Sequence, residues 1–181
     1  MTELPSIKTA RLLLRPFRLA DADDVQRLAG DRDIASTTGS IPHPYDDGIA
    51  EQWIATHQRH FEQGTWLDLA ITLDPADALV GAIGLRFEPD HDRAELGYWI
   101  GKPYWGRGYA TEAARALVQY GFDTLGLHRI YARHFTRNPA SGKVLQKIGM
   151  RHEGHRRQHE KKWGIYEDEE LYGILRDERT P

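Results

Sequence analysis

Hydrophobic and polar positions along the chain follow two different spacings, which predict a mixture of strands and helices. Short apolar or alternating segments predict strands at residues 11–17, 65–73, 79–87, 93–101, 128–136, 150–159 and 167–176. Apolar residues three and four apart, or capping residues at the ends, predict helices at residues 19–30, 48–64, 110–125 and 138–149. Residues 31–48 are rich in Gly, Pro, Ser and Thr and have no apolar period, which predicts a long loop of the kind that is often functional.

The order of these elements predicts an α+β fold. The turn clusters "DPADA" and "EPDHD" separate the three strands between residues 65 and 101, which is typical of an antiparallel meander. We expect a mixed, mostly antiparallel central sheet of about seven strands flanked by about four helices. A chain of 181 residues is long enough for one ordinary core and short for two, so residues 1–181 are expected to form a single domain.

Composition and charge narrow the classes of function. The net charge is −3 at pH 7 with acidic and basic residues intermixed, so no broad field favours DNA or an anionic membrane. Cysteine is absent, which excludes disulfides, thiolate nucleophiles and Cys-based zinc sites. Pro5 and polar residues stand where a signal peptide needs its apolar stretch, and no run approaches the ~20 residues of a membrane span, so we expect a cytoplasmic protein.

The stretch "PYWGRGYATEA" at residues 103–113 joins a predicted strand to a predicted helix through two glycines. Backbone N–H groups at a helix N-terminus bind anions, and Gly106 and Gly108 let the backbone approach a phosphate while Arg107 adds charge. The stretch lacks the Lys-Ser/Thr of a P-loop and the third glycine of a dinucleotide-binding turn, which ranks a nucleotide-binding domain last. A tight strand-to-helix turn with nothing bound is the alternative interpretation.

Two central motifs, "ELGYWIGKPYWGRGYATEA" and "RNPASGKVLQKIGM", resemble those of the GNAT superfamily of N-acetyltransferases. The opening "TARLLLRPFRLAD" and the ending "YEDEELYGIL" resemble the RimJ/RimL type of that superfamily, the ribosomal-protein N-terminal acetyltransferases. The resemblance covers nearly the whole chain in order. It implies a GNAT-like fold and an acetyl-CoA-dependent enzyme that transfers the acetyl group directly to a primary amine in a ternary complex.

The resemblance also assigns residues to acetyl-CoA. It implies that the pantetheine arm lies along Tyr98, Trp99, Ile100 and Gly101, with further contacts from Asn138 and Ser141. It implies that the pyrophosphate is held by Gly106, Arg107, Gly108, Tyr109, Ala110 and Thr111. One departure is Trp105, which stands where the family pattern has Gln or Arg; since the phosphate contacts are mostly backbone, we expect binding to survive.

The chemistry requires a base and a donor for the leaving thiolate. An amine attacks only when neutral, and unperturbed amines have pKa values of about 8–10, so a carboxylate must take a proton directly or through water. Glu95, on the strand that meets the arm, is the candidate base. The alternatives are that Glu95 is an ordinary ion-paired strand carboxylate, or that an acid from the loop or the C-terminal strands is the base. Many GNAT enzymes place a tyrosine seven residues after the motif Asn, but here that position is Leu145, and Ser141 is the candidate donor instead. Ser141 also suits the third position of the helix that Asn138 caps.

The remaining expectations concern metal, acceptor and assembly. His152 and His155 are one residue too close for the zinc-protease motif and are expected to face opposite sides of a strand, so we expect no metal site. Tyr45 and His43 are the acceptor-side positions that the long loop suggests. The acceptor amine is a protein N-terminus, a ribosomal protein included, or a small molecule, and the protein is a monomer or a homodimer. A non-catalytic module that senses acyl-CoA or docks on a partner is the second hypothesis.

Overall fold

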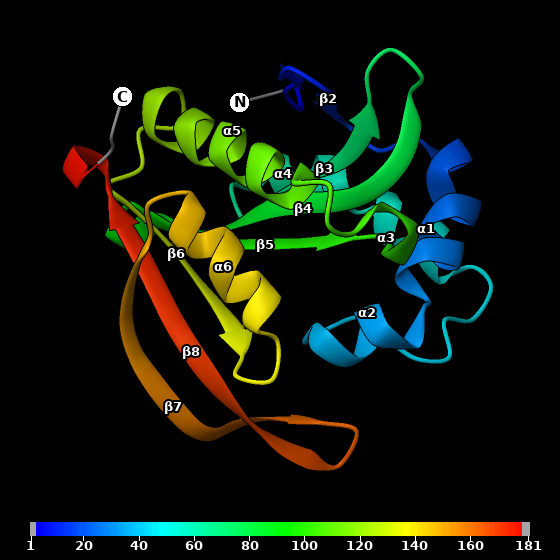
Figure 1. Ribbon diagram of the computed structural model, residues 1–181. Helices are drawn as coiled ribbons and strands as arrows, with labels where there is room; N and C mark the ends of the chain where they lie inside the picture. The colour runs from blue at the N-terminus through cyan, green and yellow to red at the C-terminus, as the bar shows by residue number, and fades with distance from the viewer. Residues whose placement is uncertain (1–2, 179–181) are drawn as a thin grey trace.

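The computed structural model describes residues 3–178, which form one mixed sheet with helices on both faces (Figure 1). Its strands follow the order β1-β2-β3-β4-β5-β6-β8-β7. They are β1 Ile7–Lys8, β2 Leu12–Arg15, β3 Trp66–Leu73, β4 Ala78–Glu88, β5 Arg93–Ile100, β6 Arg129–Phe135, β7 Arg151–Lys162 and β8 Ile165–Leu175. The α+β fold with a mostly antiparallel sheet is confirmed, with eight strands in the described residues instead of about seven.

Six α-helices accompany the sheet within the described residues. They are α1 Ala22–Ala29, α2 Arg32–Thr37, α3 Ile49–Ile54, α4 His57–Glu62, α5 Tyr109–Asp123 and α6 Pro139–Lys147. Helix α6 begins as its sequence predicts, since Asn138 caps it through Ser141 N–H and Pro139 occupies the first helical position. Gly149 ends it in the left-handed region, at φ 91°.

Strands β5 and β6 run parallel and stay paired over only three residues. Arg93–Glu95 pair with Arg129–Tyr131, and beyond that point the register ends. The strands then diverge, so β5 from Leu96 to Ile100 keeps its hydrogen bonds to β4 on one side and has no partner strand on the other. This divergence opens the middle of the sheet between β5 and β6.

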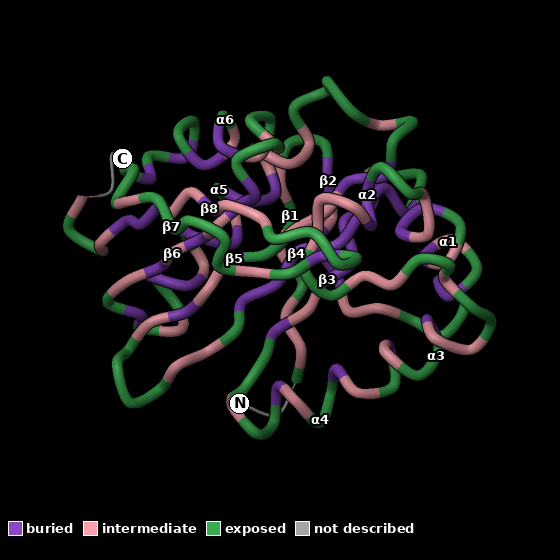
Figure 2. Tube along the Cα trace, turned by 90° about the horizontal axis from the view of Figure 1, so that it is seen from below, coloured by how far each residue is buried: buried purple, intermediate pink, exposed green. Residues whose placement is uncertain are grey.

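The core consists of two clusters, one on each face of the sheet. Helix α5 packs Ala113, Ala114 and Leu117 against the central strands, and Figure 2 shows buried positions concentrated there. The second cluster joins α1 and α3 to Ala70 and Trp99 on the opposite face. The sheet between β5 and β6 is therefore flanked by α5 and α6 on one face and by α1 and α3 at the end of the other.

Two helix predictions need correction. Residues 31–48 are not wholly loop, because α2 occupies Arg32–Thr37. Asp31 caps it by accepting from Asp33 N–H, and its six residues bury Ile34 and Ala35, which is too short for a periodic pattern to show. The helix expected at 48–64 is divided into α3 and α4, where the Thr56 hydroxyl donates to the Trp53 carbonyl 2.7 Å away and competes with the helical ladder.

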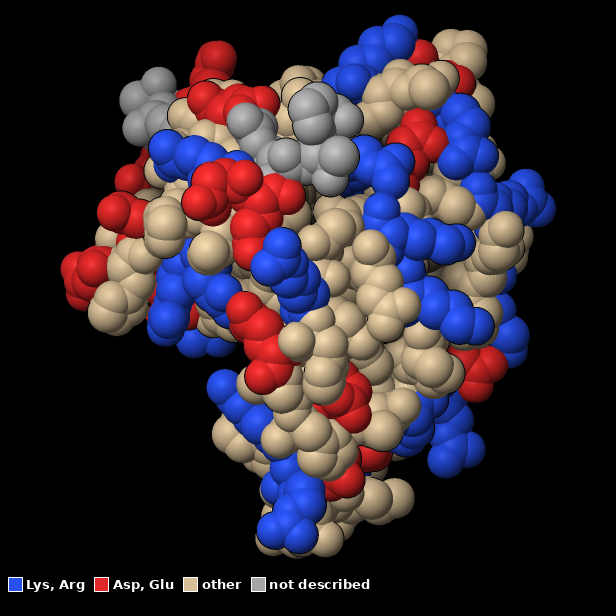
Figure 3. Space-filling model, turned by 60° about the vertical axis from the view of Figure 1, so that its left-hand side comes forward, with Lys and Arg blue, Asp and Glu red and all other residues tan. Residues whose placement is uncertain are grey.

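Charges are intermixed on the surface. Lys and Arg side chains lie beside Asp and Glu over the face seen in Figure 3, including the lower projection formed by the β7–β8 hairpin. This pattern agrees with the near-neutral net charge of −3. Among residues 3–178, no helix is long and apolar enough to cross a membrane.

Candidate active site

The turn before α5 presents open backbone to solvent. Gly106 and Gly108 have φ values of 75° and 81°, a region in which glycine is favoured, and Gly108 is the N-cap of α5. A Cβ at Gly106 meets no atom within 4 Å, so nothing in the described chain covers this backbone. Helix geometry leaves the first N–H groups of α5, those of Tyr109, Ala110 and Thr111, without intrahelical acceptors. The turn therefore has the geometry that favours anion binding.

Four hydrogen bonds hold this turn in place. The indole N–H of Trp105, which stands where the family pattern has Gln or Arg, donates to the Ile100 carbonyl at 2.6 Å. Glu112 in the first turn of α5 accepts from Arg11 Nε at 2.7 Å and from the Thr9 hydroxyl at 2.7 Å. Arg11 also donates to the Arg107 carbonyl at 3.0 Å. The start of α5 is thus fixed both to the end of β5 and to the β1–β2 segment.

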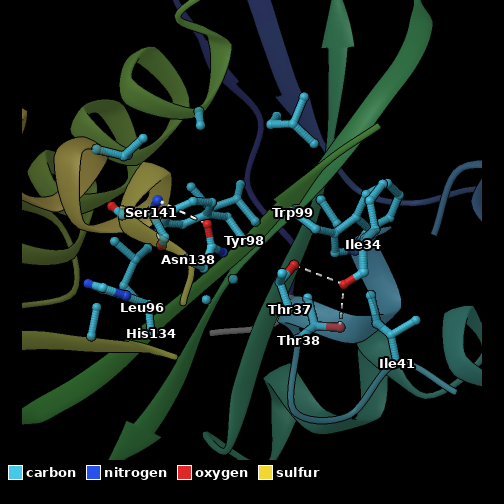
Figure 4. Close-up of a pocket in the computed structure, with 18 of the residues that line it drawn as sticks. Ile34, Thr37, Thr38, Ile41, Leu96, Tyr98, Trp99, His134, Asn138 and Ser141 are labelled. Atoms are coloured by element: carbon cyan, nitrogen blue, oxygen red, sulfur yellow. Dashed lines mark hydrogen bonds between the residues drawn. The ribbon is translucent and has the colours of Figure 1, made fainter. Parts of the chain in front are cut away.

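A cavity of about 1070 Å³ extends from this turn through the divergence of β5 and β6 to the opposite face of the sheet (Figure 4). Most of the residues predicted for the site line it together: Glu95, Tyr98, Trp99, Ile100, Gly106, Gly108, Tyr109, Ala110, Thr111, Asn138 and Ser141. Gly101 and Arg107 lie in the same turn but are not among its lining residues. Of the two loop positions, Tyr45 lines the cavity, whereas His43 instead contacts the Gly30 carbonyl at 3.1 Å.

Tyr98 and Trp99 are successive residues of β5 and point to opposite faces of the sheet, as alternation requires. In Figure 4 Tyr98 lies toward Ser141 and Asn138, while Trp99 lies toward Ile34. The cavity therefore has an α6 side reached by Tyr98 and a second side walled by Trp99. We call the second the acceptor side of the cavity, and it includes Trp53, Trp66 and Tyr45.

The Tyr98 phenol is the hydrogen-bond partner of Ser141. Its oxygen lies 2.8 Å from Ser141 Oγ and 3.2 Å from the Ser141 carbonyl oxygen. Burial raises the pKa of Tyr98 to about 12, while the hydrogen bond with Ser141 acts in the opposite direction. The position seven residues after Asn138 is Leu145, which has no phenol and is buried in the core at 1% exposure. A phenol reaches the start of α6 from the neighbouring strand instead, which the spacing along α6 cannot reveal.

Arg133 on β6 gathers three carboxylates at the point where β5 and β6 part. Its Nε donates to Glu95 Oε1 at 2.8 Å, and its Nη1 donates to Glu160 at 2.5 Å and to Glu169. Glu95 also faces Arg86 on β4, with 3.8 Å between the charged atoms. The candidate base is therefore an ion-paired strand carboxylate that also lines the cavity.

The three carboxylates share one arginine unequally. Burial and the hydrogen bond with Glu160 raise the pKa of Glu169, whose side chain is 1% exposed. Although burial opposes it, hydrogen bonds with Arg133 and Glu169 lower the pKa of Glu160. Of these two coupled carboxylates, the buried Glu169 is the one whose pKa is raised. Glu160 and Glu169 come from β7 and β8, far from the two motifs in sequence. The sequence pattern therefore did not identify them as residues of the site.

His152 and His155 do not face opposite sides, contrary to expectation. A register shift between His152 and Gly154 turns both rings toward Glu170, with His152 Nε2 at 2.6 Å and His155 Nδ1 at 2.8 Å from its oxygens. The His155 pKa is raised by the hydrogen bond with Glu170. In the described part of the chain, no group of three or more His, Cys, Asp or Glu residues is arranged to hold a metal ion.

A family model described as "Acetyltransferase (GNAT) domain" matches residues 11–151. The chain therefore belongs to the GNAT acetyltransferase family.

Known proteins align along nearly the whole chain. It is 30% identical over 176 residues to "Uncharacterized N-acetyltransferase p20" of Bacillus licheniformis, covering 97% of this chain and 98% of that protein. The crystal structure of a GNAT-family acetyltransferase from Bacillus anthracis superposes with a TM-score of 0.85 at 29% identity, covering 96% and 99% of the two chains. The same fold occurs in a RimL ribosomal L7/L12 acetyltransferase solved with coenzyme A, with a TM-score of 0.85 at 17% identity and coverage of 94% and 98%.

Proposed function

We propose that this protein transfers an acetyl group from acetyl-CoA directly to a primary amine, with both substrates bound at once in the cavity. The observation that carries the proposal is the continuity of the cavity, which runs from the open glycine turn through the parted strands to the acceptor side. The chain has no cysteine to carry an acetyl group between two half-reactions. Direct transfer is the route that these features favour.

The chain's own residues fit acetyl-CoA. Backbone N–H groups from Gly106 to Thr111 would hold the pyrophosphate, because the turn is open and α5 adds its dipole. Arg107 would add charge there. Tyr98 to Gly101, with Asn138, would lie along the pantetheine arm, and the unpaired edge of β5 offers it backbone hydrogen bonds. Acetyl-CoA supplies an activated thioester at this point.

Glu95 is the proposed base. It lies in the cavity at the last paired residue of β5, next to the segment along which the thioester would lie. Arg133 Nε donates to its carboxylate and holds it in place, and Glu160 and Glu169 bind the same guanidinium. Glu95 would take the proton from the amine directly or through water, next to Glu169, a buried carboxylate whose pKa is raised.

Ser141 is the proposed donor to the leaving thiolate. When the Tyr98 phenol donates to Ser141 Oγ at 2.8 Å, the serine proton is free to point into the cavity. A serine hydroxyl alone is a weak acid, so its role is to stabilise charge or to order a water. The Tyr98 phenol, by donating to Ser141 Oγ, strengthens the hydrogen bond that the serine would donate to the thiolate.

For the acceptor, we infer a protein N-terminus or a small-molecule amine. The RimJ/RimL resemblance of the two chain ends makes ribosomal proteins candidates among the former.

The experiment combines calorimetric titration with acetyl-CoA and measurement of free thiol release against amines and N-terminal peptides. Glu95→Gln is expected to lower kcat/KM by about 10²–10⁴-fold while acetyl-CoA affinity persists. Glu153→Gln is the matched control. Glu153 pairs with Arg129, which lies on β6 as Arg133 does, but Glu153 does not line the cavity.

One outcome would count against the enzyme, and another against Glu95 as its base. Acetyl-CoA binding without thiol release on any acceptor would instead support a non-catalytic acyl-CoA sensor. Equal losses in Glu95→Gln and Glu153→Gln would remove Glu95 from the role of base and leave a structural ion pair.

A further inference from the structure

The acceptor side of the cavity has a floor built from three rungs of the sheet. Registered residues on β3, β4 and β5 share this face: Trp66, Arg86 and Glu95 in the first rung, Asp68, Gly84 and Gly97 in the second, Ala70, Ala82 and Trp99 in the third. The second rung carries a side chain only on β3. The two glycines leave a trough across β4 and β5 that ends at Asp68.

The trough is open at Gly97 and tight at Gly84. A Cβ at Gly97 meets no atom within 4 Å, whereas a Cβ at Gly84 would lie 2.6 Å from Asp68 Oδ1. The Asp68 carboxylate therefore lies over Gly84 and points along the trough toward β5. Two strand spacings of about 4.8 Å put Asp68 roughly 10 Å from Gly97, the residue of β5 where the strands have parted.

The Asp68 carboxylate has no hydrogen bond or ion pair with any residue of the described chain, although Asp68 lines the cavity. Arg86, a cation on the same face of the sheet, is engaged elsewhere, since it lies over the Trp66 ring and faces Glu95. A half-buried carboxylate without a partner is costly, so its retention in a cavity calls for a partner that arrives with the ligand.

The walls around this carboxylate are aromatic. Trp53, Trp66, Trp99 and Tyr45 line the same side of the cavity. Aromatic faces together with one carboxylate favour a cation joined to an apolar chain, because the rings attract the positive charge and cover the methylene groups.

Hydrogen bonds from Lys162 join the β7–β8 hairpin to the loop across the cavity and restrict which acceptors can enter. Lys162 at the end of β7 donates to the Ile41 carbonyl at 2.9 Å and to the Gly39 carbonyl at 3.3 Å, and both loop residues line the cavity. His43 in the same loop lies 5.7 Å from the Trp163 ring, centroid to centroid. The β7–β8 hairpin and residues 38–43 thus close over the acceptor side, which favours a small molecule over a polypeptide.

We propose that the acceptor is a small diamine, in which one amine is acetylated at the parted strands while Asp68 binds the second, cationic amine at the far end of the trough. The inference rests on the proposed acetyl transfer and names its substrate class. In this arrangement Asp68 is a specificity residue: it positions the acceptor and takes no part in the transfer of the acetyl group.

The test measures thiol release and acetylated product with a series of linear diamines, the matching monoamines, and peptides with a lysine beside the N-terminal amine. The wild type is expected to prefer one diamine length over its monoamine by at least about tenfold in kcat/KM. Asp68→Asn is expected to raise KM for that diamine about tenfold, with kcat and monoamine kinetics little changed. Asp90→Asn, on the exposed turn between β4 and β5, is the control and is expected to change neither.

A binding measurement separates this inference from the proposed activity. Calorimetry with the diamine in the presence of coenzyme A is expected to show binding that Asp68→Asn weakens, whether or not turnover is detected. Equal kcat/KM for diamine and monoamine, or peptides preferred over every diamine, would overturn the inference while leaving acetyl transfer intact. The absence of thiol release with every amine would instead count against the proposed function.

Discussion

At the scale of single residues, the hydrogen bond between Tyr98 and Ser141 makes two side chains from different elements act as one unit. Ser141→Ala is expected to lower kcat about 10–100-fold, and Tyr98→Phe about tenfold, with acetyl-CoA affinity within a factor of about two. The double variant is expected to match Ser141→Ala alone, because Tyr98 acts through the serine. Steady-state kinetics of the three variants measures this, and multiplicative losses would show that the two residues act independently.

Asp68 makes a separate prediction about stability and pH. Burial raises the pKa of Asp68 from its usual 3.8 to about 7. As pH rises from 4 toward 7, the unfolded chain loses this proton and the folded protein keeps it, so stability falls through this window and the cost is complete above pH 7. Asp68→Asn is expected to raise Tm by several degrees at pH 8 and to leave it unchanged near pH 4. Thermal unfolding at both pH values checks this, and an equal shift at both would refute the raised pKa.

Local chemistry made some residues predictable and not others. Asn138 and Gly149 could be assigned from sequence because a helix cap depends on neighbouring residues alone. Asp68 could not, because its position opposite two glycines depends on strand register across β3, β4 and β5. The same holds for the Tyr98 phenol, whose partner is 43 residues away.

At the scale of elements, the proposed binding of acetyl-CoA depends on the start of α5. Gly108→Ala is expected to weaken acetyl-CoA binding at least about tenfold, because a Cβ at φ 81° strains the turn and intrudes where the pyrophosphate approaches. Gly64→Ala is the matched control, since Gly64 has φ 65°, its Cβ meets no atom within 4 Å, and it follows α4 away from the cavity. Both variants should lose about 1 kcal/mol of stability, and calorimetry should separate them.

If both variants keep wild-type affinity for acetyl-CoA, the turn is only structural.

Elements with long periodic patterns, such as α5, were predictable throughout. The six-residue α2 and the break between α3 and α4 were not, because short helices depend on caps and on tertiary burial more than on a pattern.

At the scale of the whole molecule, Lys162 joins the β7–β8 hairpin to the loop over the acceptor side. Burial lowers the pKa of Lys162, and its ammonium group donates to two loop carbonyls. Lys162→Met is expected to speed hydrogen exchange in residues 38–43 and to relax acceptor selectivity, with acetyl-CoA affinity unchanged. Lys161→Met is the neighbouring control, because Lys161 is exposed and lies over the Tyr166 ring. Unchanged exchange in Lys162→Met would show that these hydrogen bonds do not hold the loop.

The central claim is that one cavity binds both substrates together for direct transfer. Initial rates measured while acetyl-CoA and an accepted amine are both varied test it most directly. Direct transfer predicts intersecting reciprocal plots and no acetylated protein when acetyl-CoA is present without acceptor. Parallel plots, with an acetyl group found on the protein by mass spectrometry, would contradict it.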